Sequence, residues 1–398
     1  MTDKGNQYLI IFTLCLLVFA ASSQVMIIAP LLPQIGIELQ TSKKVLGYLI
    51  TVYAIALGLS AIVIGPLSDK IGRRKILLLG SSAMTLFLLA HGIANSFISL
   101  LIIRTATGFS AGVLSGAAVS YVGDYFPYEK RGWASGWIMS GIAMGQILGI
   151  PLGTFLAEGY GFKFPFILFG IFMGITFLLV LFFVPQPDVI LQKKKLTLRN
   201  SVKKYRDLLK KPDISAVALS YLLMFLSLSI YVIYLPLWLD QKFNVSSTDI
   251  GWLFCAGGVI NAISGPRAGK LSDQIGRKKM IISSCIGLAI FMVITTYLLV
   301  DFWVAYLIFP IVMLLIAIRT SPFQALSSEL VNSNNRGSLM SLLVAIGNIG
   351  SGFAGVLGGY LFEYTGYLSN TIFGGISIII TAYLVWKYVP EPELKSSI

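Results

Sequence analysis

Long apolar segments alternate with short polar connectors along nearly the whole chain. A helix needs roughly 20 mostly apolar residues to cross the hydrocarbon core of a bilayer. Twelve windows of the sequence meet that length, and they run over residues 8–29, 45–67, 76–95, 98–122, 132–157, 164–184, 214–239, 248–268, 280–299, 303–325, 337–361 and 367–387. This pattern predicts an all-α integral membrane protein with twelve transmembrane helices.

Composition strengthens this prediction. The 398 residues are 56% hydrophobic and only 12% charged, with a mean hydropathy of +0.83, and one water-soluble core could not bury that much apolar surface. The first window is expected to be retained rather than cleaved, because residues 1–4 carry no net positive side-chain charge and the apolar run resumes at 25–29. Cys15, Cys255 and Cys285 lie within apolar runs and are expected to be small packed side chains, with no metal site or disulfide.

The second half of the chain repeats the first. The polar connector 65–75 recurs as 269–279, so that Asp69 corresponds to Asp273 at an offset of 204 residues. Arg131 and the glycine after it recur as Arg336 and Gly337 at an offset of 205. The repeat predicts an N-terminal six-helix bundle over 1–184, a basic cytoplasmic linker over 185–213 and a C-terminal six-helix bundle over 214–398.

The distribution of basic residues predicts the orientation in the membrane. Cytoplasmic connectors carry an excess of Lys and Arg. The connectors after even-numbered windows are the basic ones, notably at 70–75, 130–131, 193–211 and 270–279, whereas the opposite connectors hold only Lys43, Lys44, Lys163 and Lys242. Both termini are therefore expected in the cytoplasm, with the linker at the anionic inner leaflet of the cell membrane and no nucleic-acid partner despite the net charge of +13.

The connector 65–75 reads Gly-x-Leu-Ser-Asp-x-x-Gly-Arg-Arg-Lys, with Asp69, Gly72 and Arg73 at its centre. It resembles the signature loop of the major facilitator superfamily, and the second copy strengthens the likeness. Over essentially its full length the chain is similar to the bacterial drug:proton antiporters of that superfamily with twelve spans. The resemblance implies two six-helix bundles related by a pseudo-twofold axis, with a substrate cavity near the membrane midplane.

The charged residues of both loops are expected to form a cytoplasmic gate. Asp69 would lie at the positive end of the helix that starts near Arg336, and Asp273 would face Arg131. Contacts of this kind would cross between the bundles and stabilise the outward-open state; the alternative is that the charges only enforce topology. The predicted gate comprises Asp69, Arg73, Arg74, Asp124, Arg131, Asp273, Arg277, Glu329 and Arg336, in which Arg73 or Arg74 pairs with Asp124 and Arg277 or Lys278 with Glu329.

Small residues recur along the fifth window. They form a face that allows close helix contact, and a proline there adds a bend. This spacing resembles the glycine-proline motif of the superfamily's antiporters and favours export, although Ile150 precedes the proline where the motif usually has glycine; ordinary helix packing is the alternative. The residues of the face are Gly141, Gly145, Gly149, Pro151 and Gly153.

Two arginines fall inside predicted spans. Arg104, with Gly108 four residues later, resembles the superfamily's span-four motif, which in antiporters is associated with proton coupling. Arg319 has no counterpart in the first half. A cation at bilayer depth costs at least about 2.5 to 3.5 kcal/mol, so each should face the substrate cavity or a partner; Arg319 could instead snorkel to the cytoplasmic surface. No Asp or Glu lies mid-span to compensate them, which favours anionic or zwitterionic substrates such as opine-like metallophores.

The proton carrier has to be a titratable group. Gln24 stands where many multidrug relatives carry a carboxylate, which leaves Glu158, His91, and Asp69 or Asp124 as candidates. The alternative for His91 is an interfacial or packed residue with no proton role. Polar and aromatic side chains are expected to line the cavity with the two arginines. The main ones are Gln24, Gln146, Tyr231, Asn261 and Asn348, together with Gln34, Tyr48, Tyr53, Tyr221, Tyr234 and Trp252.

These features together predict a secondary active transporter that exports small organic molecules by alternating access, with proton-coupled antiport driving multidrug or metabolite efflux. The sequence has no phosphate-binding Gly-x-x-x-x-Gly-Lys-(Ser/Thr) loop and no nucleophile-and-base arrangement, so neither an ATP-driven pump nor an enzyme is expected. The expected partners are the substrate, protons and lipid, with no cofactor, no metal and a monomeric state. A non-transporting sensor or structural protein remains an alternative, as do an uncoupled facilitator and an importer.

Overall fold

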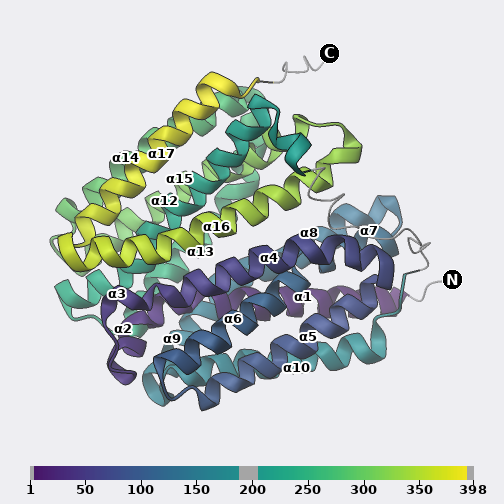
Figure 1. Ribbon diagram of the computed structural model, residues 1–398, viewed down its shortest axis with the longest axis horizontal. Coiled ribbons are helices and arrows are strands. Elements are labelled where there is room, and N and C mark those ends of the chain that lie inside the picture. The colour runs from purple at the N-terminus through teal and green to yellow at the C-terminus, as the bar shows by residue number, and fades with distance from the viewer. Residues whose placement is uncertain (1–3, 188–204, 392–398) are drawn as a thin grey trace. The chain divides into compact units, whose positions relative to one another are not determined.

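The computed structural model describes residues 4–187 and 205–391, and every regular element in these ranges is helical. The elements of the first half are α1 (Lys4–Met26), α2 (Ile28–Glu38), α3 (Lys43–Leu46), α4 (Tyr48–Ile71), α5 (Arg73–Ala90), η1 (His91–Ile93), α6 (Phe97–Leu114), α7 (Ala117–Tyr125), α8 (Tyr128–Met144), η2 (Gly145–Gly149), α9 (Ile150–Tyr160) and α10 (Lys163–Phe183) (Figure 1). Those of the second half are α12 (Pro212–Phe243), α13 (Ser247–Ile275), α14 (Arg277–Leu298), α15 (Phe302–Glu329), α16 (Ser333–Thr365) and α17 (Tyr367–Tyr388).

Eleven helical segments in the described chain are long and apolar enough to cross a membrane. The remaining expected window, 248–268, falls within α13, a helix of 29 residues that is long enough to span but more polar. The all-α membrane architecture expected from the hydropathy pattern is therefore confirmed. Part of the expected basic linker, residues 188–204, lies outside the described residues.

Four of the expected spans are interrupted, and the break in the window 45–67 lies near its start, at Gly47 between α3 and α4. Pro30 has no N–H to bond to the carbonyl four residues earlier, and the helix breaks at Ile27 between α1 and α2. Gly116, with φ of +73°, separates α6 from α7. Pro151 likewise lacks a donor, and the turn before it widens to the π-type η2. The hydropathy pattern locates these spans but not the breaks within them.

The chain folds as two compact units. Unit 1 comprises Met1–Ser42, Tyr48–Leu196 and Ser246–Trp252; unit 2 comprises Lys43–Gly47, Thr197–Val245 and Leu253–Ile398. Residues 1–3, 188–204 and 392–398 within these bounds are outside the described part of the chain. The domain boundaries expected from the sequence stay a prediction.

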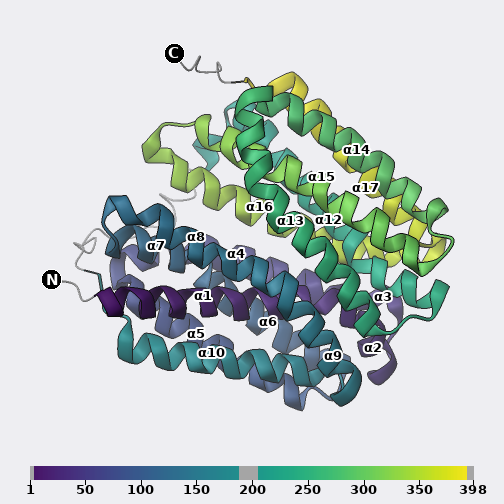
Figure 2. The same cartoon turned by 180° about the vertical axis from the view of Figure 1, so that it is seen from behind.

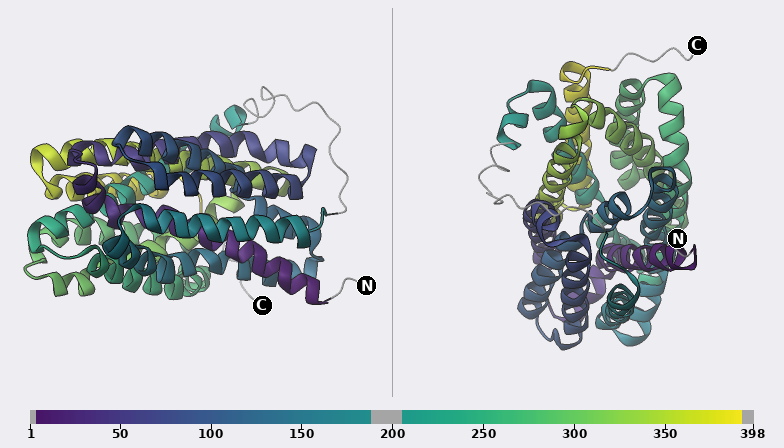
Figure 3. Two further views of the ribbon diagram at one scale, coloured as in Figure 1. Left: turned by 90° about the horizontal axis from the view of Figure 1, so that it is seen from below. Right: turned by 90° about the vertical axis from the view of Figure 1, so that its right-hand side faces the viewer.

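The two units use the same packing scheme. In unit 1, α1 packs on α8 and α10, α5 packs on α6 and α10, and α4 packs along α6 (Figure 2). In unit 2, α12 packs on α16 and α17, and α14 packs on α15 and α17. Figure 3 shows the helices of each unit running lengthwise beside one another. The equivalence of the helix pairs agrees with the internal repeat of the sequence.

Candidate functional site

Arg104 lies at the centre of a polar cluster inside unit 1. Its guanidinium is fully buried, and Nη1 donates to Oε1 of Gln24 over 3.0 Å. The Nε2 amide of Gln24 in turn donates to the Tyr53 hydroxyl over 2.8 Å. The guanidinium carbon stands 4.4 Å from the centre of the Tyr53 ring and 5.8 Å from that of Phe166. We call Arg104, Gln24, Tyr53 and Phe166 the Arg104 cluster.

Close helix packing positions these side chains. Gly108 lies one turn after Arg104 on α6, and a Cβ there would come within 2.8 Å of the Tyr53 Cα. Only a glycine therefore lets α4 approach α6 this closely, which holds the Tyr53 ring over the guanidinium. The hydrogen bond from Arg104 then fixes the orientation of the Gln24 amide on α1.

The Arg104 cluster holds one positive charge and no negative charge that balances it. All three partners of the guanidinium are neutral, Nε has no hydrogen-bond partner, and no carboxylate in the described part of the chain forms an ion pair with Arg104. Burying an unpaired charge is costly, and cation–π contacts recover only part of the cost. Such a site favours an anionic group with which the guanidinium can form charge-assisted hydrogen bonds.

The expected proton carriers lie in different surroundings. His91 is fully buried in η1, where Nδ1 lies 2.9 Å from the Phe87 carbonyl and Nε2 has no partner. Its ring stacks on Phe166 at 4.3 Å between centroids, so one aromatic ring joins His91 to the Arg104 cluster. Glu158 is exposed, and its carboxylate accepts from the backbone N–H of Thr248 over 3.3 Å. The side chain of Asp69 is outside the described part of the structure.

Arg319 is buried on α15 inside unit 2, with 2% of its surface exposed. Its guanidinium lies against the Cys285 thiol of α14, within hydrogen-bonding reach. Nε and Nη1 have no hydrogen-bond partner. The alternative that Arg319 snorkels to the membrane surface is therefore wrong, because the head group points into the unit and not out of it.

Among the other expected cavity residues, Gln24 and Tyr53 contact Arg104. Tyr231 is fully buried, with its hydroxyl 3.1 Å from that of Thr295. Asn348 donates to the Val344 carbonyl of its own helix. Gln146 lies half-buried in η2 and Asn261 half-buried in α13. The sequence thus pointed to Arg104, Gln24 and Tyr53, but nothing distinguished Phe166 among the many phenylalanines of its span.

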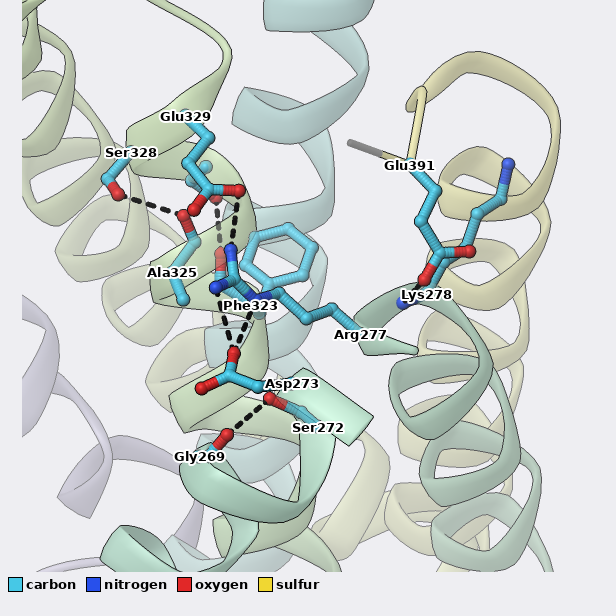
Figure 4. Close-up of polar contacts among 11 residues, drawn as sticks. Gly269, Ser272, Asp273, Arg277, Lys278, Phe323, Ala325, Ser328, Glu329 and Glu391 are labelled. Carbon is cyan, nitrogen blue, oxygen red and sulfur yellow. Dashed lines mark hydrogen bonds and ion pairs between the residues drawn. The ribbon is translucent and has the colours of Figure 1, made fainter. Parts of the chain in front are cut away.

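The loop motifs form the expected ion pairs. Arg73 Nε lies 2.7 Å from Oδ2 of Asp124, and Arg73 Nη1 donates to Ser68 Oγ over 2.7 Å. In the second half, Arg277 bridges Asp273 at 2.9 Å and Glu329 at 2.5 Å (Figure 4). These two arginines make the pairs, and not the basic residues that follow them.

Both ion pairs close within one unit, and the expected contacts between the bundles, of Asp69 with the helix that starts near Arg336 and of Asp273 with Arg131, stay predictions. Arg73 and Asp124 both belong to unit 1, and Arg277 and Glu329 both belong to unit 2. Asp273 binds Arg277 of its own motif, while Arg131 donates through Nε to the Phe126 carbonyl nearby. The side chain of Arg336 is outside the described residues, as is that of Asp69.

A further repeat contact was missed from the sequence. The backbone N–H of Arg74 donates to Oε1 of Gln186 over 3.1 Å. In the second half, the backbone N–H of Lys278 donates to Oε1 of Glu391 over 3.2 Å (Figure 4). Each motif is thereby tied to the end of the last helix of its own unit. The signal was present, because Val-Pro-Gln-Pro at 184–187 recurs as Val-Pro-Glu-Pro at 389–392.

The glycines of the fifth span lie against α1. A Cβ at Gly141 would be 2.7 Å from the Cys15 carbonyl oxygen, and one at Gly145 would be 3.0 Å from the Ser22 Cβ. Gly153 would meet Ile27 in the same way at 2.7 Å, and Gly149 packs against Ser23. The small-residue face therefore allows α1 to lie directly on α8, η2 and α9.

Comparison with known proteins assigns the chain to a family. The sequence model described as Major Facilitator Superfamily matches residues 14–238 and, again, residues 217–398. The chain belongs to the major facilitator superfamily. The resemblance carried by the loop motifs is thereby confirmed, and the chain is a multi-pass membrane protein of a transporter family.

Its relatives in this superfamily include proteins named for drug resistance. The chain is 24% identical to Multidrug resistance protein 2 of Bacillus subtilis over 97% of its length and 98% of the relative's. It is 30% identical to Multidrug resistance protein MdtG of Salmonella typhi over 68% of each chain. It is also 25% identical, over 87% of each chain, to the uncharacterized MFS-type transporter YceJ of Bacillus subtilis.

Solved structures give the same fold. A crystal structure of a D-xylose-proton symporter matches with a TM-score of 0.79 at 18% identity, covering 99% of this chain and all of the symporter. A bacterial homolog of the human lysosomal transporter Spinster matches with a TM-score of 0.74 at 17% identity, covering 97% of this chain and 96% of that one. The major facilitator fold expected from the sequence is therefore confirmed.

Proposed function

We propose that this protein is a secondary active transporter that exports small organic molecules across the cell membrane by alternating access, in exchange for protons. Membership of the superfamily supports transport. The names of its multidrug-resistance relatives support efflux. The observation that carries the proposal to a substrate class is the buried, uncompensated guanidinium of Arg104.

The preferred substrates are anionic or zwitterionic, with opine-like metallophores as one class. A carboxylate can accept two parallel hydrogen bonds from a guanidinium, and in a low-dielectric interior such a pair is strong. Arg104 keeps Nε without a partner, and the neutral Gln24 beside it adds no competing charge. A lipophilic cation in the same place would meet a fixed positive charge, and like charges repel.

Coupling to protons needs a group that gains and loses a proton during the cycle. His91 is the carrier that we favour, because its ring stacks on Phe166 and so adjoins the Arg104 cluster. An anionic substrate bound at Arg104 would offset the positive charge that disfavours protonation of a neighbouring imidazole. Glu158 and Asp69 are the other candidates.

The loop motifs act as the cytoplasmic gate in this proposal, with both termini on the cytoplasmic side and the transporter acting as a monomer. The ion pairs Arg73–Asp124 and Arg277–Glu329 would hold each motif rigid at the end of its own bundle. A rigid motif can then dock and undock as one body during alternating access.

Transport by purified protein in liposomes with an imposed pH gradient tests the proposal. Anionic or zwitterionic solutes should move against the proton gradient, and cationic solutes of similar size should move at least about tenfold more slowly. Arg104→Gln should remove this selectivity, while Arg267→Gln, a change at an exposed arginine of α13, should preserve it.

Three outcomes would contradict the proposal. Solute flux that does not respond to the pH gradient would indicate an uncoupled facilitator. Solute flux in the same direction as the protons would indicate an importer. The absence of transport for every solute class would favour a sensor or structural role.

A further inference from the structure

The two buried arginines differ in their surroundings, and Arg319 has fewer neutral partners than Arg104. The Arg104 guanidinium donates to an amide and lies over two aromatic rings. Arg319 contacts the Cys285 thiol, and both Nε and Nη1 are buried without a hydrogen-bond partner. Two unpartnered nitrogens of a guanidinium point to a ligand that accepts hydrogen bonds.

A third buried donor lies at the same depth. The Ser220 hydroxyl on α12 is fully buried and has no partner. Seven residues later on the same face of α12, Ser227 contacts the sulfur of Met292 at 3.6 Å, and Met292 lies seven residues after Cys285 on α14. Because seven residues make about two helical turns, this contact places Ser220 and Cys285 at a similar height along helices that run in the same direction.

The register of α15 brings Arg319 to this level as well. A Cβ on Gly287 would be 3.2 Å from a methyl carbon of Leu315, so these residues face each other. Arg319 is one turn further along α15, and that turn brings it to the Cys285 thiol. Arg319 and Cys285 therefore share one buried contact, and Ser220 lies on α12 next to Tyr221, whose ring packs on Phe323 one turn beyond Arg319.

No carboxylate in the described part of the chain forms an ion pair with Arg319. A guanidinium stays protonated in proteins, and an unpaired buried charge costs several kcal/mol. A water molecule could accept the hydrogen bonds but could not neutralise the charge. With 2% of its surface exposed, Arg319 is also out of reach of lipid headgroups.

We propose that Arg319, Ser220 and Cys285 form a binding site for a small monovalent inorganic anion, of which chloride is the physiological example. The guanidinium supplies the charge, and the hydroxyl and thiol supply further donors around the same point. The anion is a resident counter-ion that stabilises unit 2, distinct from the organic substrate proposed to bind at the Arg104 cluster. This site has no equivalent in the first half, because the residue 205 positions before Arg319 is Leu114.

Thermal unfolding of the purified full-length protein in detergent tests this site. The sodium salts of chloride, bromide and nitrate are titrated at constant ionic strength against gluconate, which is too large to enter. The melting temperature should rise saturably, by about 2 to 4 °C, with the small anions only. Arg319→Gln should abolish the rise, and Arg104→Gln should retain it.

Ser220→Ala provides a milder variant in which the charge is kept. Loss of one hydrogen bond to an anion should raise the half-saturating chloride concentration by about tenfold. Ser284→Ala is the matched control, because its hydroxyl already donates to the Ile281 carbonyl over 2.9 Å, and it should leave the titration unchanged.

Two results would overturn the proposal. The first is a melting temperature that does not depend on chloride in the parent protein; strong destabilisation by Cys285→Ser in that case would make the Cys285 thiolate the counter-charge. The second is a chloride response that survives in Arg319→Gln or disappears in Arg104→Gln. Neither result bears on the transport assay, so failure here and failure of the proposed function are distinguishable.

Discussion

At the scale of single residues, the Arg104 cluster shows how a buried charge is oriented without a counter-charge. Gln24 uses both ends of its amide, accepting from Arg104 through oxygen and donating to Tyr53 through nitrogen. The guanidinium can only donate and the Ala21 carbonyl, 3.2 Å from Nε2, can only accept, so these two groups set which end of the amide faces Arg104, and the Tyr53 hydroxyl is a second acceptor for Nε2. The position of an uncharged group thus controls the electrostatics of the site.

Tyr53→Phe should weaken the binding of anionic substrates while it preserves the ring above Arg104. Without the hydroxyl, the Gln24 amide loses one of the two acceptors of its Nε2 group and is held less firmly beside Arg104, and a lost hydrogen bond of about 1 kcal/mol corresponds to a rise of about fivefold in the KM of efflux. Transport assays in liposomes measure this change. Tyr297→Phe, at an exposed tyrosine of α14, serves as the control for loss of a hydroxyl, and an equal rise in both variants would contradict a specific role of the Tyr53 hydroxyl.

His91→Gln tests the proton carrier. Glutamine keeps a polar side chain but cannot exchange a proton near neutral pH, so the pH gradient should no longer drive efflux, while counterflow of substrate at equal pH should continue. Flux measured with and without the gradient separates the two. Gradient-driven efflux at the parent rate in His91→Gln would transfer the role to Glu158 or Asp69.

The residue-level site was only partly accessible from the sequence. Charge and polarity within apolar runs identified Arg104, Gln24 and Arg319, because a polar group at bilayer depth is costly unless it has a partner or a function. Phe166, Ser220 and Cys285 look like ordinary membrane residues, and only the helix register brings them to the arginines. The tie between Lys278 and Glu391 was readable from the Val-Pro-Gln-Pro repeat, since a repeated short motif implies a repeated contact.

At the scale of elements, hydropathy predicted where helices cross but not where they break. The breaks at Ile27, Gly116 and η2 depend on proline and glycine chemistry inside apolar segments, and each is flanked by close contacts. The contact of α1 with α8, η2 and α9 is close, because glycines at every fourth position leave no room for side chains. A π-type turn within that contact allows α9 to change direction relative to α8.

Gly145→Leu should disrupt this contact. A Cβ there already meets Ser22 at 3.0 Å, so a leucine would force α1 away from η2, at a cost of about 1 to 3 kcal/mol for an overpacked site. Transport should be lost and the melting temperature lowered. Gly136→Leu on α8 is the matched control, because nothing lies within 4 Å of its Cβ position, and it should be tolerated. Equal damage from both would mean that helix propensity, not packing, explains the loss.

At the scale of the whole molecule, the repeat gives each unit its own ion pair that holds the loop motif. Arg73–Asp124 fastens the first loop motif and Arg277–Glu329 the second, and each pair closes within one unit. A single latch shared between bundles would make the two pairs depend on each other. Two separate ion pairs would contribute independently to the free energy of unfolding, and single and double variants can measure this.

Asp124→Asn and Glu329→Gln, made singly and together, distinguish these arrangements. Each change removes one partner of a half-buried ion pair, and each should lower the free energy of unfolding by about 1 kcal/mol, with the uncharged amide keeping the side-chain volume. Because the pairs lie in different units, the double variant should show the sum of the single effects to within about 0.5 kcal/mol. Asp207→Asn, which removes an exposed pair with Lys210, should have no measurable effect. If the double variant is as stable as the less stable single variant, the two ion pairs act as one latch. That result would contradict the prediction that the two pairs are independent.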